Sequence, residues 1–223
     1  MKKTLFILGL PGSGKSEMAR QITKHVFEKY QWRTRYFNDY GILKTMSDYD
    51  TDRQFKSAEL GGFDVLDLTA FDIALRRLEE VVGITIKTED LEKAEMLLVE
   101  FSRNDYQRAF RQFSRAFFQD AYFLHLDTDV EICKQRIDDR IAHPVYEDDY
   151  PVSEYIFEKY YYNDDGQSLP QTLRREYGID ESRVLVVDNN YPIEDIIKAG
   201  DTLKSIYKFI DSIIELRELS TAP

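Results

Sequence analysis

The chain has few of the residues that form covalent or metal cross-links in proteins. One cysteine, Cys133, and three histidines occur among 223 residues, so the sequence excludes a disulfide framework and a thiolate zinc site. Glycine (10) and proline (6) are also sparse, and no repeat, low-complexity tract or Pro/Ser-rich linker divides the sequence. We therefore expect one compact domain over residues 1–223.

Positive charge and long apolar runs are scarce as well. The 30 Lys and Arg residues face 41 Asp and Glu residues, for a net charge of −11, which disfavours binding to nucleic acids or anionic lipids. No apolar run has the length of a membrane span. The start, MKKTLFILGL, resembles a signal peptide, but its apolar stretch is short and no small-residue cleavage site follows. We expect a cytoplasmic protein without nucleic-acid or membrane partners, and the sequence does not indicate an oligomeric state.

Short apolar runs alternate with stretches of helical periodicity along the chain. The runs predict strands at residues 4–8, 33–37, 95–101, 121–126 and 183–187. Helices are predicted over residues 17–29, 107–118, 129–142 and from Pro192 onward. Continuous apolar strands separated by helices are typical of a parallel sheet that is buried on both faces. The pattern predicts an α/β fold with a five-stranded parallel sheet between helical layers.

Two connections are longer than a crossover requires. Residues 38–94 follow the second predicted strand, and residues 143–166 follow the helix after the fourth. Long connections in compact domains are often binding loops or lids, so we expect a helical substrate-covering insert and a LID-like segment. The second contains six tyrosines but only one Lys or Arg residue, Lys159. It either closes by aromatic packing or belongs to a partner interface.

The most specific motif follows the first predicted strand and opens a helix. It matches G-x-x-x-x-G-K-[ST], the phosphate-binding P-loop, and consists of Gly9, Leu10, Pro11, Gly12, Ser13, Gly14, Lys15 and Ser16. Its glycines let backbone N–H groups converge on phosphate oxygens at a helix N-terminus. Lys15 adds a charge for the β- and γ-phosphates, and the Ser16 hydroxyl is a Mg²⁺ ligand in this motif. We therefore expect ATP and Mg²⁺ as cofactors.

With this motif, the sequence resembles the P-loop kinase superfamily of nucleoside, nucleotide and small-metabolite kinases, with no subfamily assigned. The guanine-reading Asn-Lys-x-Asp of GTPases is absent, and so is the Walker B acidic pair typical of AAA-type ATPases. The resemblance implies a P-loop NTPase three-layer sandwich with a five-stranded parallel core, a substrate-binding region and a LID. It covers most of the chain as architecture, but the P-loop alone is a specific motif.

Acidic residues end two of the predicted strands. Asp39 follows the second strand, where open α/β sheets bind ligands, and the resemblance implies that it positions the acceptor hydroxyl or takes its proton. A turn-forming Asn-Asp pair is the alternative. Glu100 ends the third strand, where a buried carboxylate needs a cation or donors, and the resemblance implies the Mg²⁺ ligand of a Walker B acid. Asn189 and Asn190 follow the last strand, where related kinases bind adenine, although a turn explains them equally well.

Several arginines follow Glu100 along the chain. Arg103 is loosely similar to the arginine of kinase Glu-Arg-Ser and Asp-Arg-Tyr motifs, which implies a substrate-anion contact. Arg136 and Arg140 lie four residues apart on one predicted helix, so that both could bind phosphate and stabilise the transition state. Pairing with neighbouring acids on a solvated face is the alternative for the latter two. The same alternative applies to a basic stripe formed by Arg108, Arg111 and Arg115.

Together these residues predict an ATP-dependent kinase that transfers the γ-phosphoryl group to a small-molecule acceptor. Its catalytic residues are Lys15, Asp39, Glu100, Arg136 and Arg140, with Asp39 and Arg103 at the substrate and Ser16 and Glu100 at the metal. The alternative is a nucleotide-binding regulatory protein with slow ATPase activity. The acceptor cannot be identified from these residues.

Overall fold

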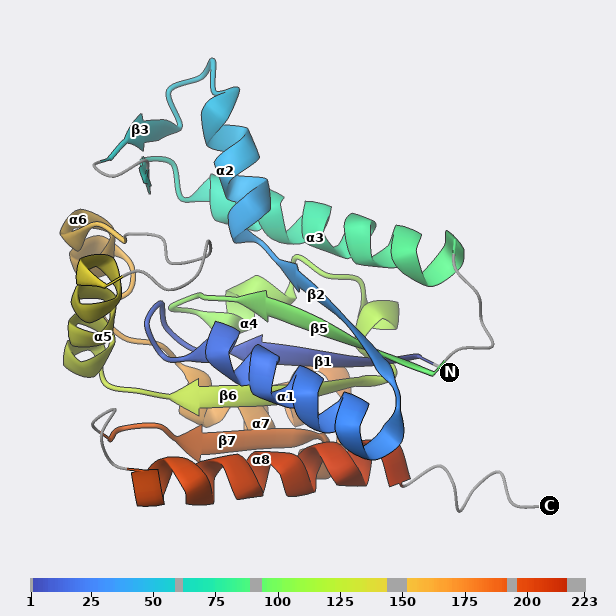
Figure 1. Ribbon diagram of the computed structural model, residues 1–223. Helices are drawn as coiled ribbons and strands as arrows, with labels where there is room; N and C mark the ends of the chain where they lie inside the picture. Colours follow the sequence, from blue (N-terminus) through green and yellow to red (C-terminus); the bar gives the residue numbers. More distant parts are fainter. Residues whose placement is uncertain (1, 59–61, 89–93, 144–151, 192–195, 216–223) are drawn as a thin grey trace.

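A five-stranded parallel sheet forms the centre of the protein (Figure 1). The computed structural model describes residues 2–58, 62–88, 94–143, 152–191 and 196–215. The strand order is β2-β5-β1-β6-β7, and every neighbouring pair is parallel. The strands are β1 (Lys2–Leu8), β2 (Arg33–Asn38), β5 (Glu95–Phe101), β6 (Ala121–Asp127) and β7 (Val184–Asp188). The predicted sheet is confirmed, with strand ends within two residues of those expected.

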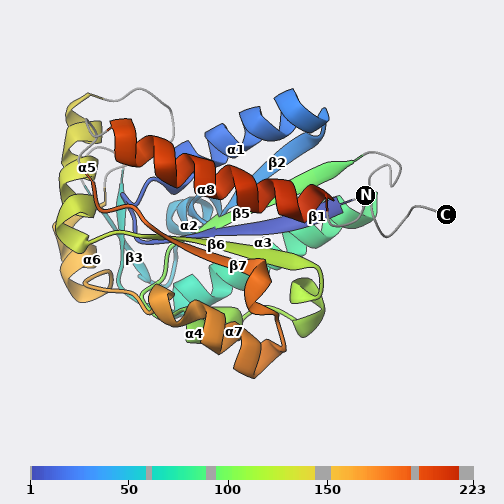
Figure 2. The ribbon, with the colours of Figure 1, turned by 90° about the horizontal axis from the view of Figure 1, so that it is seen from below.

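Helices cover both faces of this sheet (Figure 2). One face carries α1 (Lys15–Tyr30) and α8 (Ile196–Glu215); the other carries α3 (Thr69–Thr88), α4 (Tyr106–Phe110) and α7 (Leu169–Tyr177). The predicted start of the last helix at Pro192 lies outside the described residues. None of the helices that the structure describes is both long and apolar enough to span a membrane.

The central strand β1 is buried on both sides because its residues alternate between the two cores. Leu5 and Ile7 pack under α1 and α8, whereas Phe6 and Leu8 pack under α3, α4 and α7. Phe6 stacks on Phe123 with ring centroids 5.0 Å apart. Burying one such side chain contributes about 1.5–3 kcal/mol, so the apolar runs that predicted the strands also stabilise the layers.

The predicted insert over residues 38–94 has two parts. Its second part, α3, packs on the sheet through Leu75, Leu78 and Val82 and serves as the crossover helix from β2 to β5. Its first part contains α2 (Tyr40–Asp48) and an antiparallel pair, β3 (Phe55–Ser57) and β4 (Phe63–Val65). In Figure 1, α2 and β3 rise beyond the sheet, so this first part extends past the ends of the strands.

The LID-like segment contributes one short helix, α6 (Glu154–Lys159), which lies beside α5 (Val130–Ala142) (Figure 1). Ser153 caps α6 and also hydrogen-bonds to Asp64 of β4, which ties the segment to the insert. Tyr160 stacks on Phe71 of α3 at 4.5 Å. This contact agrees with the expectation that the segment closes by aromatic packing. Tyr155 and Tyr162, in contrast, are exposed. Tyr146 and Tyr150 lie outside the described residues.

The helix predicted over residues 107–118 is wrong. The chain forms only α4 and then a separate 3-10 helix over Arg115–Phe118. Between them, the backbone N–H of Ser114 donates to Glu79 of α3 at 2.9 Å, and its hydroxyl bonds the same carboxylate. Tertiary packing of the phenylalanines against the sheet and this external bond together override local helical periodicity.

The basic stripe that depended on that helix is also dispersed. Arg108 forms an ion pair with Asp72 at 2.7 Å, and Arg111 lies 3.8 Å from Glu176. Arg115 lies over the ring of Tyr177. These partners support the solvated-face alternative for the three arginines.

Asp211 connects α8 to α1, and its loss is expected to destabilise the fold. His25 Nε2, Lys29 Nζ and the Tyr30 hydroxyl lie 2.8–2.9 Å from its carboxylate. Burial acts to raise the pKa of Asp211, but the hydrogen bonds outweigh it and the pKa is lowered. We expect Asp211→Asn to lower the free energy of unfolding at pH 7 by about 1–2 kcal/mol.

Because the folded-state pKa is depressed, this contribution is present above the unfolded-state pKa of about 3.9 and disappears as pH falls through the folded value. Urea unfolding at several pH values measures it. Asp201→Asn is the matched control, because Asp201 is an exposed acid in the same helix. A difference from wild type that persists below both pKa values would contradict the interpretation.

Candidate active site

The P-loop has a backbone conformation that requires glycine. Gly12 has φ +83°, and a Cβ there would lie 2.3 Å from the carbonyl oxygen of Cys133 in α5. Gly9 has φ +143°, and its Cβ would lie 2.8 Å from the carbonyl oxygen of Leu126. Both conflicts involve backbone atoms, so a side chain could be accepted only if the loop moved. Glycine is therefore required at both positions for the loop to pack against α5 and β6 in this conformation.

Two side chains brace this loop from outside the motif. The N–H of Gly9 donates to the Tyr106 hydroxyl at 2.7 Å, and Asn189 Nδ2 donates to the carbonyl of Ser13 at 2.7 Å. Tyr106 and Asn189 are buried. The sequence analysis missed both contacts, because Tyr106 and Asn189 carry no local motif and reach the loop only through the packing of α4 and the end of β7.

Lys15 lies in the buried part of the loop. Its Nζ donates to the carbonyl of Leu10 at 2.7 Å. Burial lowers the pKa of Lys15, and the charges of Glu100 and Asp39 oppose that shift. The three predicted charged residues are thus close enough for the Lys15 ammonium to interact electrostatically with both carboxylates.

Ser16 and Glu100 form an oxygen-rich pair beside Lys15. The strand register aligns Asn38, Glu100 and Ile7 across β2, β5 and β1, which places Glu100 next to the P-loop. The Ser16 hydroxyl lies 3.3 Å from both carboxylate oxygens, and burial raises the pKa of Glu100 while Lys15 opposes the rise. Hydroxyl and carboxylate oxygens suit Mg²⁺, which takes few protein ligands and shares the rest with phosphates and water. These two residues fit the metal that the P-loop implies.

Tyr36 of β2 also contacts this pair, which the sequence did not indicate. Its hydroxyl donates a hydrogen bond to Oε2 of Glu100. We expect Tyr36→Phe to raise the Mg²⁺ concentration needed for nucleotide binding by about 10-fold, because Glu100 loses the donor that orients it. Nucleotide affinity measured across a Mg²⁺ series tests this. Tyr49→Phe, at a tyrosine that is 82% exposed, is the control, and an unchanged Mg²⁺ requirement would contradict the assignment.

Asp39 and Arg103 form a buried ion pair on the other side of Glu100. Arg103 Nη1 lies 2.6 Å from Asp39 Oδ2, and the two side chains are 2% and 9% exposed. Arg103 also donates to the carbonyl of Phe71 at 2.9 Å and lies over that ring. Burial opposes the charge of Arg103, but Asp39 keeps its pKa above the usual range. Arg103 is thus placed behind Asp39 and orients it, instead of lining the cavity as a substrate-anion contact.

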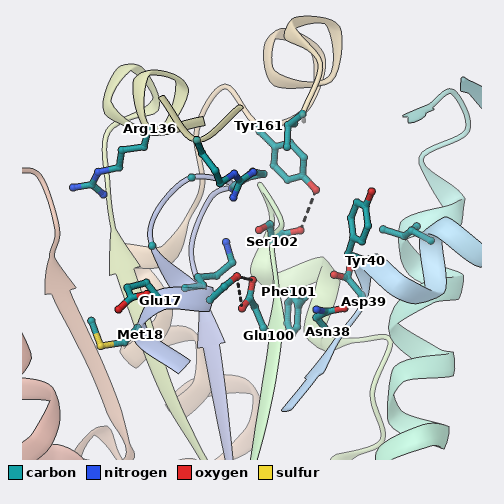
Figure 3. Close-up of a pocket in the computed structure, with 18 of the residues that line it drawn as sticks. Glu17, Met18, Asn38, Asp39, Tyr40, Glu100, Phe101, Ser102, Arg136 and Tyr161 are labelled. Atoms are coloured by element: carbon teal, nitrogen blue, oxygen red, sulfur yellow. Dashed lines mark hydrogen bonds between the residues drawn. The ribbon is translucent and has the colours of Figure 1, made fainter. Parts of the chain in front are cut away.

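The two arginines of α5 separate in the structure. Arg136 Nη2 donates to the carbonyls of Asn189 and Tyr191 at 2.9 and 2.8 Å, and its guanidinium points away from Glu100 and Asp39 (Figure 3). Both arginines line the cavity, and the charge of Arg140 contributes to the lowered pKa of Lys15. Arg136 therefore supports the loop after β7, and phosphate contact by Arg140 stays a prediction.

A cavity of about 510 Å³ joins these groups at the carboxyl ends of the strands. Asp39 and Tyr40 face it from the start of α2, and Tyr161 approaches from the LID-like segment with its hydroxyl toward the carbonyl of Ser102 (Figure 3). The P-loop and Asn189 line the opposite end. The cavity therefore spans a phosphate-binding end and an end bounded by the insert and α6.

Residues 5–165 match the AAA domain family. The chain belongs to this family. Its P-loop, sheet order and flanking helices also confirm the resemblance to the P-loop kinase-like superfamily, without a subfamily. At the end of β5, Glu100 is followed by Phe101, so this member of the family lacks the acidic pair that is typical of AAA-type ATPases.

Solved structures share the fold at low sequence identity. Kti12 of Chaetomium thermophilum in complex with ADP-AlF3 is 16% identical, with a TM-score of 0.52 over 93% of this chain and 98% of that one. The crystal structure of APE1195 is 16% identical, with a TM-score of 0.50 over 96% and 98% of the two chains. A sugar kinase from Janibacter sp. HTCC2649 is 16% identical, with a TM-score of 0.48 over 95% of each. No curated protein matches the sequence.

Proposed function

We propose that this protein is an ATP- and Mg²⁺-dependent kinase that phosphorylates the hydroxyl group of a small molecule. The observation that carries the proposal is the Asp39–Arg103 pair. Asp39 is a second carboxylate close to the phosphate-binding loop, and a buried arginine fixes its position. A carboxylate in that place is suited to orienting an acceptor hydroxyl.

The residues along the cavity have different roles in the proposed reaction. The P-loop amides and Lys15 bind the nucleotide phosphates, and Ser16 with Glu100 are the protein ligands for Mg²⁺. Bound Mg-ATP supplies the phosphoryl group and part of the charge neutralisation. Arg140 adds positive charge near the transferring group, and the aromatic side chains of the LID-like segment exclude water.

The chemical step is a direct displacement at phosphorus. The acceptor oxygen forms a bond to the γ-phosphorus while the bond from that phosphorus to the β,γ-bridging oxygen breaks, and that electron pair leaves with ADP. Asp39 receives the acceptor proton. Its contact with Arg103 keeps the carboxylate oriented before the acceptor arrives.

ADP release measured with pooled acceptors tests the proposal. Pools of nucleosides, nucleotides, sugars and other alcohols are added to protein with Mg-ATP, and one or more pools should raise turnover well above the rate with water alone. Asp39→Asn is expected to lose about 10²-fold of that stimulation and still bind ATP, with thermal melting as the check on folding.

Flat turnover across every pool, together with tight ATP binding, would contradict the kinase proposal. That result would favour the regulatory alternative, in which the nucleotide is bound and slowly hydrolysed. Full acceptor stimulation in Asp39→Asn would contradict the role given to Asp39.

A further inference from the structure

The end of the cavity beyond Asp39 is apolar. We call it the acceptor end and define it by the six side chains that bound it: Leu43 of α2, Phe63 and Val65 of β4, Phe71 of α3, and Val152 and Ile156 of the LID-like segment. Leu43, Val65, Phe71 and Ile156 belong to one buried cluster, against which Phe63 and Val152 pack. A ligand here exchanges water for hydrocarbon and aromatic surface.

Positive charge lines only the opposite end. The basic residues that line the cavity in the described part of the chain are Lys15 and Arg20 of α1 and Arg136 and Arg140 of α5. None of them belongs to α2, β4, α3 or α6. The neighbouring residues 59–61 and 144–151, outside the described ranges, contain no Lys or Arg in sequence. In the described part of the chain, the elements that bound the acceptor end therefore contribute no Lys or Arg side chain to the cavity lining.

Arg103, which lies behind Asp39, already has hydrogen-bond and ion-pair partners within the protein. Arg103 contacts Asp39, the carbonyl of Ser102 at 2.5 Å and the carbonyl of Phe71. A carboxylate or phosphate brought into the acceptor end would lose its hydration, face Asp39 and gain no cationic partner, so its binding there is unfavourable. The site thus discriminates against acceptors that carry an anionic group.

Few polar groups are available for a highly hydroxylated acceptor. Asp39, Asn38 and Ser102 line the boundary with the phosphate-binding end, and Tyr40 and Tyr161 add two hydroxyl groups. The six side chains that define the acceptor end are hydrocarbon or aromatic. Tyr40 and Phe63 lie with ring centroids 5.5 Å apart and ring planes tilted by 32°, which provides an aromatic surface. Aromatic walls of this kind pack well against rings, whereas each unpaired sugar hydroxyl would lose hydrogen bonds to water.

We propose that the acceptor is an uncharged alcohol with an aromatic or alicyclic body. The body occupies the acceptor end, and the single reacting hydroxyl lies against Asp39. The hydroxyl oxygen bonds to the γ-phosphorus, its proton passes to Asp39, and ADP leaves with the electrons of the broken phosphorus–oxygen bond. This inference rests on the kinase function proposed above and adds the class of its substrate.

Matched probes that differ only in charge test the inference by binding. 4-Methylbenzyl alcohol and 4-(hydroxymethyl)benzoate have similar shape and the same reacting group, and glucose serves as the uncharged polyol. Calorimetry with the Mg-ADP-bound wild-type protein is expected to show 4-methylbenzyl alcohol binding at least about 10-fold more tightly than either of the others. Equal binding, tighter binding of the benzoate or of glucose, or binding of no probe would overturn the inference.

A charge introduced into the wall tests the reason for that preference. Val152→Arg should weaken the binding of 4-methylbenzyl alcohol and strengthen the binding of the benzoate, so that the order of their affinities is reversed or the difference disappears. Val81→Arg, at an exposed valine of α3, is the matched control and should leave the order unchanged. If Val152→Arg fails a melting test, the wild-type comparison still decides. An unchanged order in folded Val152→Arg would overturn the assignment of this wall to the acceptor.

The binding and transfer readouts separate two kinds of failure. Preferential binding of the neutral alcohol without its phosphorylation in Mg-ATP would leave the ligand class supported and contradict the kinase function. Phosphorylation of the benzoate or of glucose at a higher rate than the neutral alcohol would support the kinase function and contradict the acceptor class.

Discussion

Lys15→Met is expected to lower acceptor-dependent turnover by about 10³-fold while the protein remains folded. The buried Lys15 ammonium interacts electrostatically with Glu100 and Asp39, and the transferring phosphoryl group gathers negative charge beside it. Removing one preorganised donor from such a site costs about 10²–10³-fold, and the loss of a full charge places the effect at the upper end. Steady-state ADP release measures it.

Lys24→Met is the matched control for this variant. Lys24 lies on the same helix, with its side chain 69% exposed and only a 4.0 Å contact to Glu28. It should keep wild-type turnover. Circular dichroism and thermal melting of both variants establish that the fold persists, and turnover of Lys15→Met within 10-fold of wild type would contradict the role of the P-loop lysine.

Arg103→Met is expected to produce the largest loss of stability. The variant leaves the buried Asp39 carboxylate without its 2.6 Å partner, and breaking a buried ion pair from one side costs about 3–5 kcal/mol. Methionine retains much of the apolar volume beside Phe71 and Phe101, so the change reports mainly on charge. Urea unfolding gives the free energy difference.

A double-mutant cycle with Asp39→Asn separates the ion pair from simple packing. Each single variant leaves one buried charge alone, whereas the double variant removes both charges. We expect the double variant to be less destabilised than the sum of the two single variants by about 1–3 kcal/mol. Additive effects would show that Arg103 does not act through Asp39.

The fold could be predicted largely because its signals are local. Apolar runs such as residues 95–101 are buried on both sides of the sheet, and the P-loop motif by itself defines a strand, a turn and a helix. The break after Phe110 could not be predicted in this way. It depends on Glu79, which is 35 residues from Ser114, and local periodicity contains no information about such a partner.

The site shows the same division between local and distant signals. Glu100 could be identified because a charge at the end of an apolar strand needs a partner, and the structure brings it to Ser16. Arg103 follows the same strand, but the sequence does not indicate the direction in which its side chain points. Its guanidinium turns into the protein toward Phe71, because Asp39 and a backbone carbonyl compensate its charge there. Tyr36 reaches the site only because β2 and β5 are neighbours in the sheet.

The destination of the γ-phosphoryl group tests the central claim most directly. ATP labelled with ¹⁸O in the γ-phosphoryl group is incubated with the protein, Mg²⁺ and an acceptor that stimulates ADP release, and the products are separated by mass spectrometry. A kinase places the label in a phosphate ester of the acceptor in equal amount to the ADP formed. Label found only in inorganic phosphate, with or without the acceptor, would mean that water is the acceptor and would contradict the proposed phosphoryl transfer.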